Sequence, residues 1–487
     1  MKKIGKYTRT IIGTLVGATF LAAVAAAIAS RGDQPLELWH TVRLSEAFEA
    51  HMVDDVRDLA GYLALEDRLF AELEAEVYAE VGTGSEYALI RYSSGSAADP
   101  KKRQPDFNRT FELRVEEPRG GVLLLHGMSD SPYSLRALGE KLHEEGFWVI
   151  GLRLPGHGTA PSGLMRVTWQ DMAAAARLAM DHLVAQVGPK PIHVAGYSTG
   201  AALALDLTVD SIGNPDQRTP ASLILVSPAI GISAAAALAG PTAALGRVPG
   251  FGRLGWSSIT PEFDPYKYNS FTVNAGAQVH RLTRSVASRV ASIARSADAN
   301  AMPPILVFKS TVDATVSTSA VVDRLLGRFS DNGNELVLFD INRFAVPSIL
   351  LVSDPGPFTN QLMDDGSLPF AIRLIANENS ESRDIVAQFK PPISQEVTKT
   401  ESLDLAWPAG IISLSHVALP FPPEDPLYGR FRPERKDVIF LGQVEIRGER
   451  GLLRISSDWL LRLRYNPFYS VLETRVLDWV DTIGSTP

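Results

Sequence analysis

The sequence contains no cysteine, and this absence removes several classes of chemistry at once. Disulfide bonds, thiolate metal sites, cysteine nucleophiles and anchors attached through a lipidated cysteine are all excluded. The absence of cysteine does not identify the cellular compartment, because an exported protein can lack disulfides. An excess of basic residues is also missing: the formal net charge is −8, which gives no reason to expect a nucleic-acid partner. We expect no metal ion and no cofactor.

The chain is long and apolar enough for a large core. Hydrophobic residues make up 45% of its 487 residues. This length allows either one large domain with insertions or two domains.

The first 30 residues have the pattern of a membrane anchor or a signal sequence. Four basic residues precede an uncharged stretch at 11–30: Lys2, Lys3, Lys6 and Arg9. A stretch of about 20 residues could span a bilayer, with its basic flank in the cytoplasm and the rest of the chain on the periplasmic or extracellular side. Residues 27–29 resemble an A-x-A cleavage site, so secretion after cleavage is the alternative. The apolar run is long for a signal peptide, and we favour a retained single-pass anchor.

Strand-like and helix-like patterns alternate along most of the chain. Residues 36–81 show apolar residues at helical spacing, and residues 31–106 are interpreted as a helical N-terminal extension that ends in a polar loop. Continuous apolar runs then indicate buried strands at 121–126, 148–152, 192–195, 222–226, 304–309 and 336–340. This alternation predicts an α/β fold with a mostly parallel, doubly wound sheet and helices on both faces.

Two segments interrupt the alternation and divide the predicted core into 107–230, 303–343 and 409–487. Segment 231–302 is interpreted as a lid, because it becomes rich in glycine and aromatics: Phe251, Trp256, Phe263, Tyr266, Tyr268 and Phe271. These aromatics suggest an apolar or acyl substrate, or they simply pack the lid itself. Segment 344–408 is interpreted as an inserted β or α+β element.

The motif G-x-S-x-G at 196–200 lies between a strand-like run and a helix-like run. This context is typical of a nucleophile elbow, in which a strained turn exposes the hydroxyl of the central serine, here Ser198. Small neighbours are needed in so crowded a turn, which explains Gly196 and Gly200.

A serine hydroxyl needs a neighbouring base, usually a histidine that a carboxylate orients. Only His280 and His416 follow Ser198 in the chain. His416 is the better base, because His280 falls in the predicted lid. The acid is expected after a late strand, which favours Asp313, with Asp340 as the fallback.

Two backbone N–H groups are needed for an oxyanion hole. One is expected from Thr199, directly after the nucleophile. The other is expected from Met128, after the turn formed by His126 and Gly127. We expect His126 and His157 to shape their loops and not to act as acid or base.

Together these motifs resemble an α/β-hydrolase of the branch that holds monoacylglycerol lipases, lysophospholipases and serine-aminopeptidase-like proteins. The matching stretches are 124–128 with Ser131-Pro132, 153–158, 196–200, Asp313 and His416. The chain departs from this family in two ways. A long segment separates Asp313 from His416, and an N-terminal extension precedes the core.

The resemblance implies a membrane-anchored serine hydrolase that cleaves carboxylic esters of small or lipid-like molecules through an acyl-enzyme. Two alternatives remain open. The same triad could cleave amides or peptides, or the fold could serve as a non-catalytic anchored scaffold.

Overall fold

The structure is a computed structural model that describes residues 34–231, 252–313, 315–346, 348–442, 449, 451–454 and 462–484. The stretch at 11–30, interpreted as an anchor, lies outside these residues. Among the described residues, no helix combines the length and the apolar character that a bilayer crossing requires.

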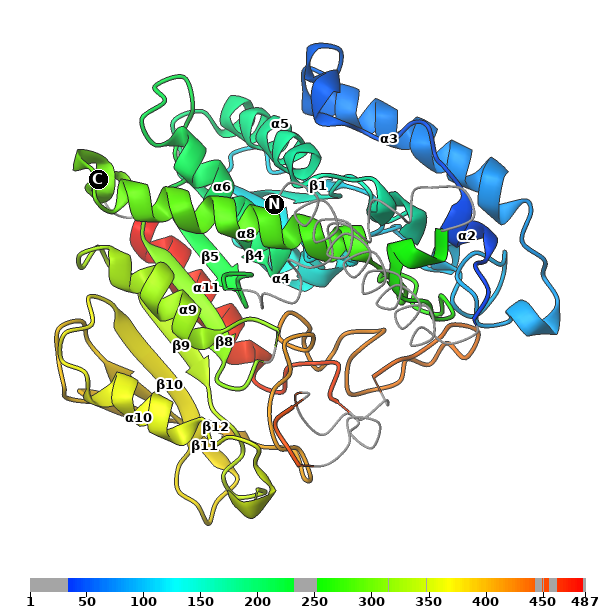
Figure 1. Cartoon of the computed structure of the whole chain (residues 1–487). Coiled ribbons are helices and arrows are strands. Elements are labelled where there is room, and N and C mark those ends of the chain that lie inside the picture. Colours follow the sequence, from blue (N-terminus) through cyan, green and yellow to red (C-terminus); the bar gives the residue numbers. More distant parts are fainter. Residues whose placement is uncertain are drawn as a thin grey trace, which may run out of the picture.

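A single large sheet of ten strands organises the molecule, in the order β1-β3-β2-β4-β5-β8-β9-β10-β11-β12 (Figure 1). From β3 to β10 every neighbouring pair is parallel, whereas β1, β11 and β12 run antiparallel to their neighbours. The strands are β1 (Phe111–Leu113), β2 (Gly121–Leu125), β3 (Trp148–Leu152), β4 (Ile192–Tyr197), β5 (Ser222–Val226), β8 (Ile305–Ser310), β9 (Glu335–Phe339), β10 (Ala371–Asn377), β11 (Asp384–Lys390) and β12 (Lys399–Ala406).

Helices cover both faces of this sheet, which confirms the predicted fold class. Strands β2, β4, β5, β8 and β9 are buried along their whole length, as expected for apolar runs in a parallel sheet. One apolar cluster joins the sheet to α5 (Trp169–Val187), α6 (Thr199–Ser211), α8 (Val273–Ile293) and α9 (Thr318–Arg324). A second cluster joins the other face to α4 (Arg136–Glu144) and α11 (Tyr469–Gly484).

The N-terminal region contributes helix α3 (Leu59–Leu73), which packs against α5 beside the core (Figure 1). Asp58 begins this helix, because its carboxylate accepts a hydrogen bond from Gly61 N at 2.8 Å. The residues that α3 buries recur at helical spacing, and one of them is charged: Leu59, Tyr62, Leu65, Glu66, Leu69 and Leu73. A short helix, α2 (Leu38–Thr41), precedes it.

Much of the segment interpreted as a lid packs against the rest of the protein. Helix α8 lies against α5 and α6, and a small antiparallel pair forms from β6 (Trp256–Ser258) and β7 (Phe271–Thr272). The Tyr266 ring stacks on Tyr133 with centroids 4.1 Å apart, and Trp256 meets His40 edge-on at 4.9 Å. Phe251 lies outside the described residues. Buried Trp256, Tyr266 and Tyr268 therefore pack within the protein.

Segment 344–408 extends the main sheet. After β9, the chain forms α10 (Gly356–Asp364) and returns as β10, parallel to β9. Strand β11 then runs antiparallel to β10, and β12 runs antiparallel to β11. The carboxyl end of β12 therefore lies on the same side of the sheet as the carboxyl end of β9. Asn342 N donates to Ile412 O at 2.7 Å, which fastens the returning chain beside the end of β9.

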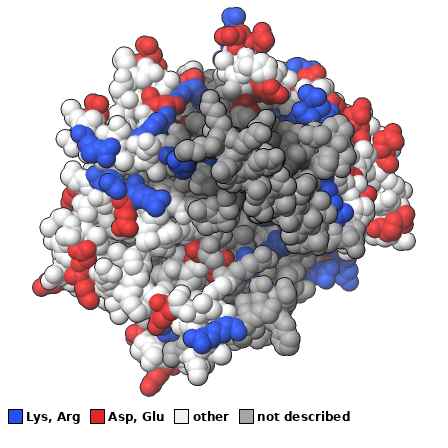
Figure 2. Space-filling view, in the orientation of Figure 1, with Lys and Arg blue, Asp and Glu red and all other residues white. Residues whose placement is uncertain are grey.

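Surface charge is mixed. On the face that Figure 2 draws, Lys and Arg side chains occur among Asp and Glu side chains. This mixture matches a sequence with 47 basic and 55 acidic residues.

Candidate active site

Ser198 stands at a strained turn between β4 and α6. Its φ of 54° and ψ of −111° lie in a region that side-chain-bearing residues rarely adopt. A Cβ added to Gly200 would come within 1.9 Å of Leu125 O, and one added to Gly196 within 2.5 Å of the Ala201 backbone. Only glycine fits at these two positions. Ser198 N donates to Val226 O at 2.9 Å, and Ser198 itself is partly accessible.

Asp313 and His416 meet, although they are 103 residues apart in the chain. The Nδ1 of His416 lies 3.0 Å from Oδ2 of Asp313, and both side chains are buried. Oδ1 of Asp313 accepts from Thr315 N at 2.8 Å and from Val316 N at 3.0 Å. A carboxylate held in this way orients the imidazole so that Nδ1 carries the proton and Nε2 is free to accept one.

His416 also lies beside the elbow. Its ring centroid is 5.3 Å from that of Tyr197, the residue before Ser198, and Tyr197 Oη donates to His416 O at 3.3 Å. No hydrogen bond joins His416 to Ser198 among the described residues. Such contacts are often long in a site without substrate and shorten on binding.

A buried lysine contacts the same carboxylate. Lys309 Nζ donates to Oδ2 of Asp313 at 2.5 Å, and neither side chain is exposed. Burial lowers the pKa of Lys309, and the charge of Asp313 offsets this only in part. Burial would raise the pKa of Asp313, but the charges of His416 and Lys309 hold it well below its usual range. Asp313 is therefore ionised throughout the physiological range.

Glu449 holds the backbone of the histidine. Its Oε2 accepts from His416 N at 3.0 Å, and its own N–H donates to Ser413 Oγ at 3.1 Å. Burial raises the pKa of Glu449, and the nearby charge of Asp313 raises it further, while Arg462 acts against both. Sequence reasoning missed Glu449, and no spacing or motif around it would have revealed it.

The two expected oxyanion donors are free to receive a ligand. Within the described residues, the backbone N–H groups of Met128 and Thr199 have no hydrogen-bond acceptor. Thr199 is the first residue of α6, where the N–H groups of a helix are unsatisfied and its dipole is positive. Met128 follows β2 in a turn whose next residue, Ser129, has a φ of 67°.

His126 braces that turn, as the sequence suggested. Its Nδ1 lies 2.9 Å from Gly127 O, and its Nε2 accepts from Leu154 N at 3.0 Å. The bond to a carbonyl assigns the proton to Nδ1. Burial, together with the neighbouring His157, places the pKa of His126 well below its usual value, so the ring stays neutral.

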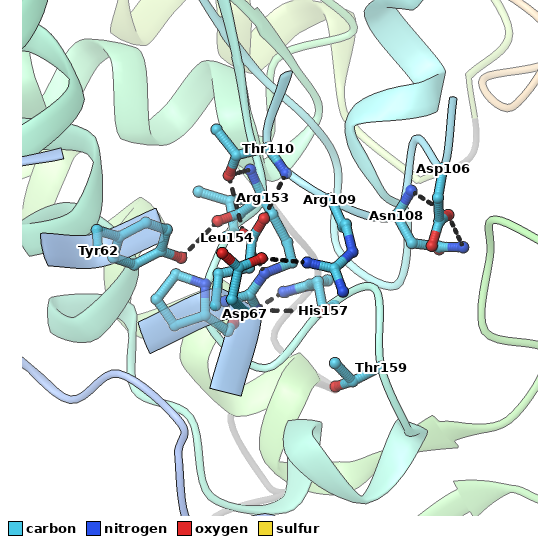
Figure 3. Close-up of polar contacts among 12 residues, drawn as sticks. Tyr62, Asp67, Asp106, Asn108, Arg109, Thr110, Arg153, Leu154, His157 and Thr159 are labelled. Atoms are coloured by element: carbon cyan, nitrogen blue, oxygen red, sulfur yellow. Dashed lines mark hydrogen bonds and ion pairs between the residues drawn. The ribbon is translucent and has the colours of Figure 1, made fainter. Parts of the chain in front are cut away.

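The loop after β3 is anchored from α3 (Figure 3). Arg153 forms a buried ion pair with Glu66 at 2.6 Å, and Tyr62 Oη donates to Arg153 O at 2.6 Å. Glu66 also accepts from Thr110 N at 2.9 Å. The N-terminal region thus fixes the loop that supports His126.

The other candidates lie apart from this cluster. His280 lies on α8 and is half-buried. Asp340 pairs with Arg343 at 3.0 Å and accepts from Thr311 Oγ1 at 3.3 Å. Asp313 is therefore the carboxylate that contacts His416. Among the described residues, no group of three or more His, Asp or Glu side chains could hold a metal ion.

Parts of the chain are similar to known proteins. The family model Hydrolase_4, described as serine aminopeptidase, S33, matches residues 116–340. A thermostable monoacylglycerol lipase from Bacillus sp. (strain H-257) is 37% identical over 87 residues, which are 18% of this chain and 34% of that protein. The chain thus matches about a third of the length of this curated relative.

Similar solved structures include two hydrolases. The monoacylglycerol lipase of Paleococcus ferrophilus is 20% identical, with 47% of this chain and 88% of that chain covered and a TM-score of 0.36. A carboxyl esterase from Bacillus coagulans, in complex with glycerol, is 15% identical, with 47% and 84% covered and a TM-score of 0.36. The family match spans the strands from β2 to β9 and the elbow between β4 and α6, and over residues 116–340 the chain is similar to the S33 family of α/β-hydrolases.

Proposed function

We propose that this chain is a serine hydrolase that cleaves carboxylic esters, including lipid-like ones. Ser198 is the nucleophile, His416 the general base and Asp313 the acid that orients it. The observation that carries the proposal is the buried Asp313–His416 pair beside a strained serine elbow. The monoacylglycerol lipases and the esterase among the similar proteins favour ester substrates.

The reaction proceeds in two halves. Ser198 Oγ attacks the ester carbonyl while Nε2 of His416 takes its proton, and the N–H groups of Met128 and Thr199 bind the resulting oxyanion. Collapse of this intermediate breaks the bond to the alcohol, which leaves with the proton from His416. Water then attacks the acyl-enzyme, His416 takes the water's proton, and Ser198 recovers a proton from His416 as the carboxylic acid leaves.

Labelling with a fluorophosphonate probe tests this proposal. We expect labelling of the wild-type chain and none of Ser198→Ala. A panel of p-nitrophenyl esters of increasing chain length, run beside aminoacyl amides, then separates an esterase from an amidase, which the family description keeps as the second candidate. A wild-type chain that resists the probe and all substrates would favour the non-catalytic scaffold.

We further propose that residues 11–29 anchor the chain in a membrane, with the body on the periplasmic or extracellular side. The support is the basic flank before an uncharged stretch. Carbonate extraction of membranes tests the anchor. A chain that carbonate removes from the membrane fraction has no retained anchor, which is also the result expected after signal cleavage.

A further inference from the structure

A pocket of about 220 Å³ lies between the N-terminal segment 42–49 and the loop 156–171. Neither Ser198 nor His416 lines it. The pocket exceeds the roughly 150 Å³ of an engineered cavity that binds benzene, and it falls below the ~300 Å³ at which pockets for drug-sized ligands begin. Its size therefore suits a small molecule or a short chain.

The pocket wall combines apolar side chains with hydroxyl groups. The apolar part consists of Val42, Leu44, Phe48, Leu69 and Val167. Thr159 is 2% exposed and Ser162 is 8% exposed, and the side chain of Thr159 bonds to Tyr268.

Two arginines and two acids line the pocket, and they differ in their partners. Arg43 and Arg166 line it and are exposed, and neither forms an ion pair with another described residue. The two acids of the wall, in contrast, have partners. Asp171 accepts from Ala50 N at 2.8 Å and from Thr168 N at 2.7 Å, and Glu49 contacts His51 at 3.2 Å.

We propose that this pocket binds a small anionic amphiphile. Its carboxylate or phosphate group pairs with Arg43 and Arg166, which are suited to planar and tetrahedral oxyanions. Its short apolar tail lies on Leu44, Phe48 and the other apolar side chains of the wall, where it removes apolar surface from water. The pocket is separate from the serine site, so binding does not depend on the proposed function.

One route of hydrogen bonds connects the pocket to the oxyanion turn. Thr159 N donates to Tyr268 Oη at 2.8 Å, and Tyr268 N donates to Ser129 O at 2.8 Å. The same turn also receives a bond from outside the pocket lining, since Leu154 N donates to His126 Nε2 at 3.0 Å (Figure 3 shows this loop). Ser129 and His126 flank the turn that presents Met128. A bound amphiphile therefore alters ester hydrolysis without occupying the serine site, a consequence that rests on the proposed function.

Calorimetric titration of the full chain tests the site. Octanoate and octyl phosphate are the probes, and octanol is the uncharged control. We expect both anions to bind the Ser198→Ala protein and octanol to bind at least tenfold more weakly. The double variant Arg43→Gln with Arg166→Gln should weaken anion binding at least tenfold. Arg284→Gln is the matched control, since Arg284 is also exposed but lies on α8, away from the pocket.

Three results would overturn the proposal: no anion binding, equal binding of octanol, or unchanged binding in the double variant. A fourth comes from protein whose Ser198 carries a phosphonate with an octyl chain. If that protein no longer binds octanoate, the pocket belongs to the serine site. Ester hydrolysis is a separate readout, because Ser198→Ala protein can bind octanoate even if the wild-type chain hydrolyses no ester.

Discussion

The ammonium group of Lys309 and the imidazole of His416 share one carboxylate oxygen, Oδ2 of Asp313. The carboxylate stabilises the imidazolium that forms when His416 takes a proton. Lys309 neutralises part of that charge and also fixes the direction of the carboxylate. Lys309 therefore reduces the stabilisation that Asp313 gives to the imidazolium.

Replacing Lys309 should therefore change the pH dependence of the reaction. In Lys309→Met, the full charge of Asp313 acts on His416 and favours its protonated, inactive form. The acidic limb of kcat/KM should move to higher pH by about one unit. Profiles of kcat/KM against pH for the two proteins check this. A limb that stays in place would show that Lys309 has a structural role only.

Loss of the nucleophile or the base should remove activity while the fold persists. We expect Ser198→Ala and His416→Ala each to lower kcat for p-nitrophenyl esters by about 10⁴-fold or more. His280→Ala is the control and should leave kcat nearly unchanged, because His280 lies on α8. Circular dichroism checks the fold. A comparable loss of kcat in His280→Ala would contradict the assignment of His416 as the base.

The buried ion pair between Glu66 and Arg153 should matter more than its exposed neighbour. Glu66→Gln leaves the Arg153 charge buried without its partner and should lower the free energy of unfolding by about 3–5 kcal/mol. Asp67→Asn is the matched control: Asp67 is next on α3, and its 2.8 Å pair with Arg109 has side-chain exposures of 79% and 35%. Asp67→Asn should lower the free energy of unfolding by less than about 1 kcal/mol. Urea unfolding of the three proteins gives the comparison, and equal losses would contradict it.

His40 should make the stability of the protein sensitive to mild acid. Its Nδ1 accepts from Glu37 N at 3.0 Å and its Nε2 lies 2.9 Å from Ser270 Oγ, an arrangement that suits the neutral ring. Burial lowers the pKa of His40 to about 4. Because the unfolded chain binds the proton more readily, stability is lost as the pH falls from about 6.5 to about 4, by roughly 2–3 kcal/mol.

Melting temperatures measured across this pH range test the role of His40. His40→Asn should make their dependence on pH less steep without removing it, because burial also lowers the pKa of His126, His157 and His193. His51→Asn should not, since His51 is 76% exposed. A slope in His40→Asn as steep as that of the wild type would show that His40 does not contribute.

The elements that sequence reasoning located were those with strong local signals. Continuous apolar runs indicated β2, β5 and β9, and the spacing of two glycines around Ser198 indicated the elbow. Asp313 was located because it follows β8 directly. Lys309 had a readable signal, a lysine within an otherwise apolar strand, that sequence reasoning did not use.

Contacts between distant segments had no such signal. The pairing of β10 with β9 depends on register across a crossover, which no local pattern specifies. The same holds for Glu449, a single acid in a charged stretch that meets His416 only through folding. The aromatics of 231–302 were visible in the sequence, but their partners, such as Tyr133 for Tyr266, were not.

The number of strands that the chain adds after β9, and their directions, decide where it returns. A crossover to a parallel strand returns the chain to the carboxyl end of β9, and so does a complete hairpin. A single antiparallel strand instead takes it to the opposite end of the strands. The stretch between the acid and the base can therefore grow or shrink only by whole crossovers or whole hairpins. Removing β11 and β12 together would still deliver His416 to Asp313, while removing β12 alone would leave the base on the wrong side of the sheet.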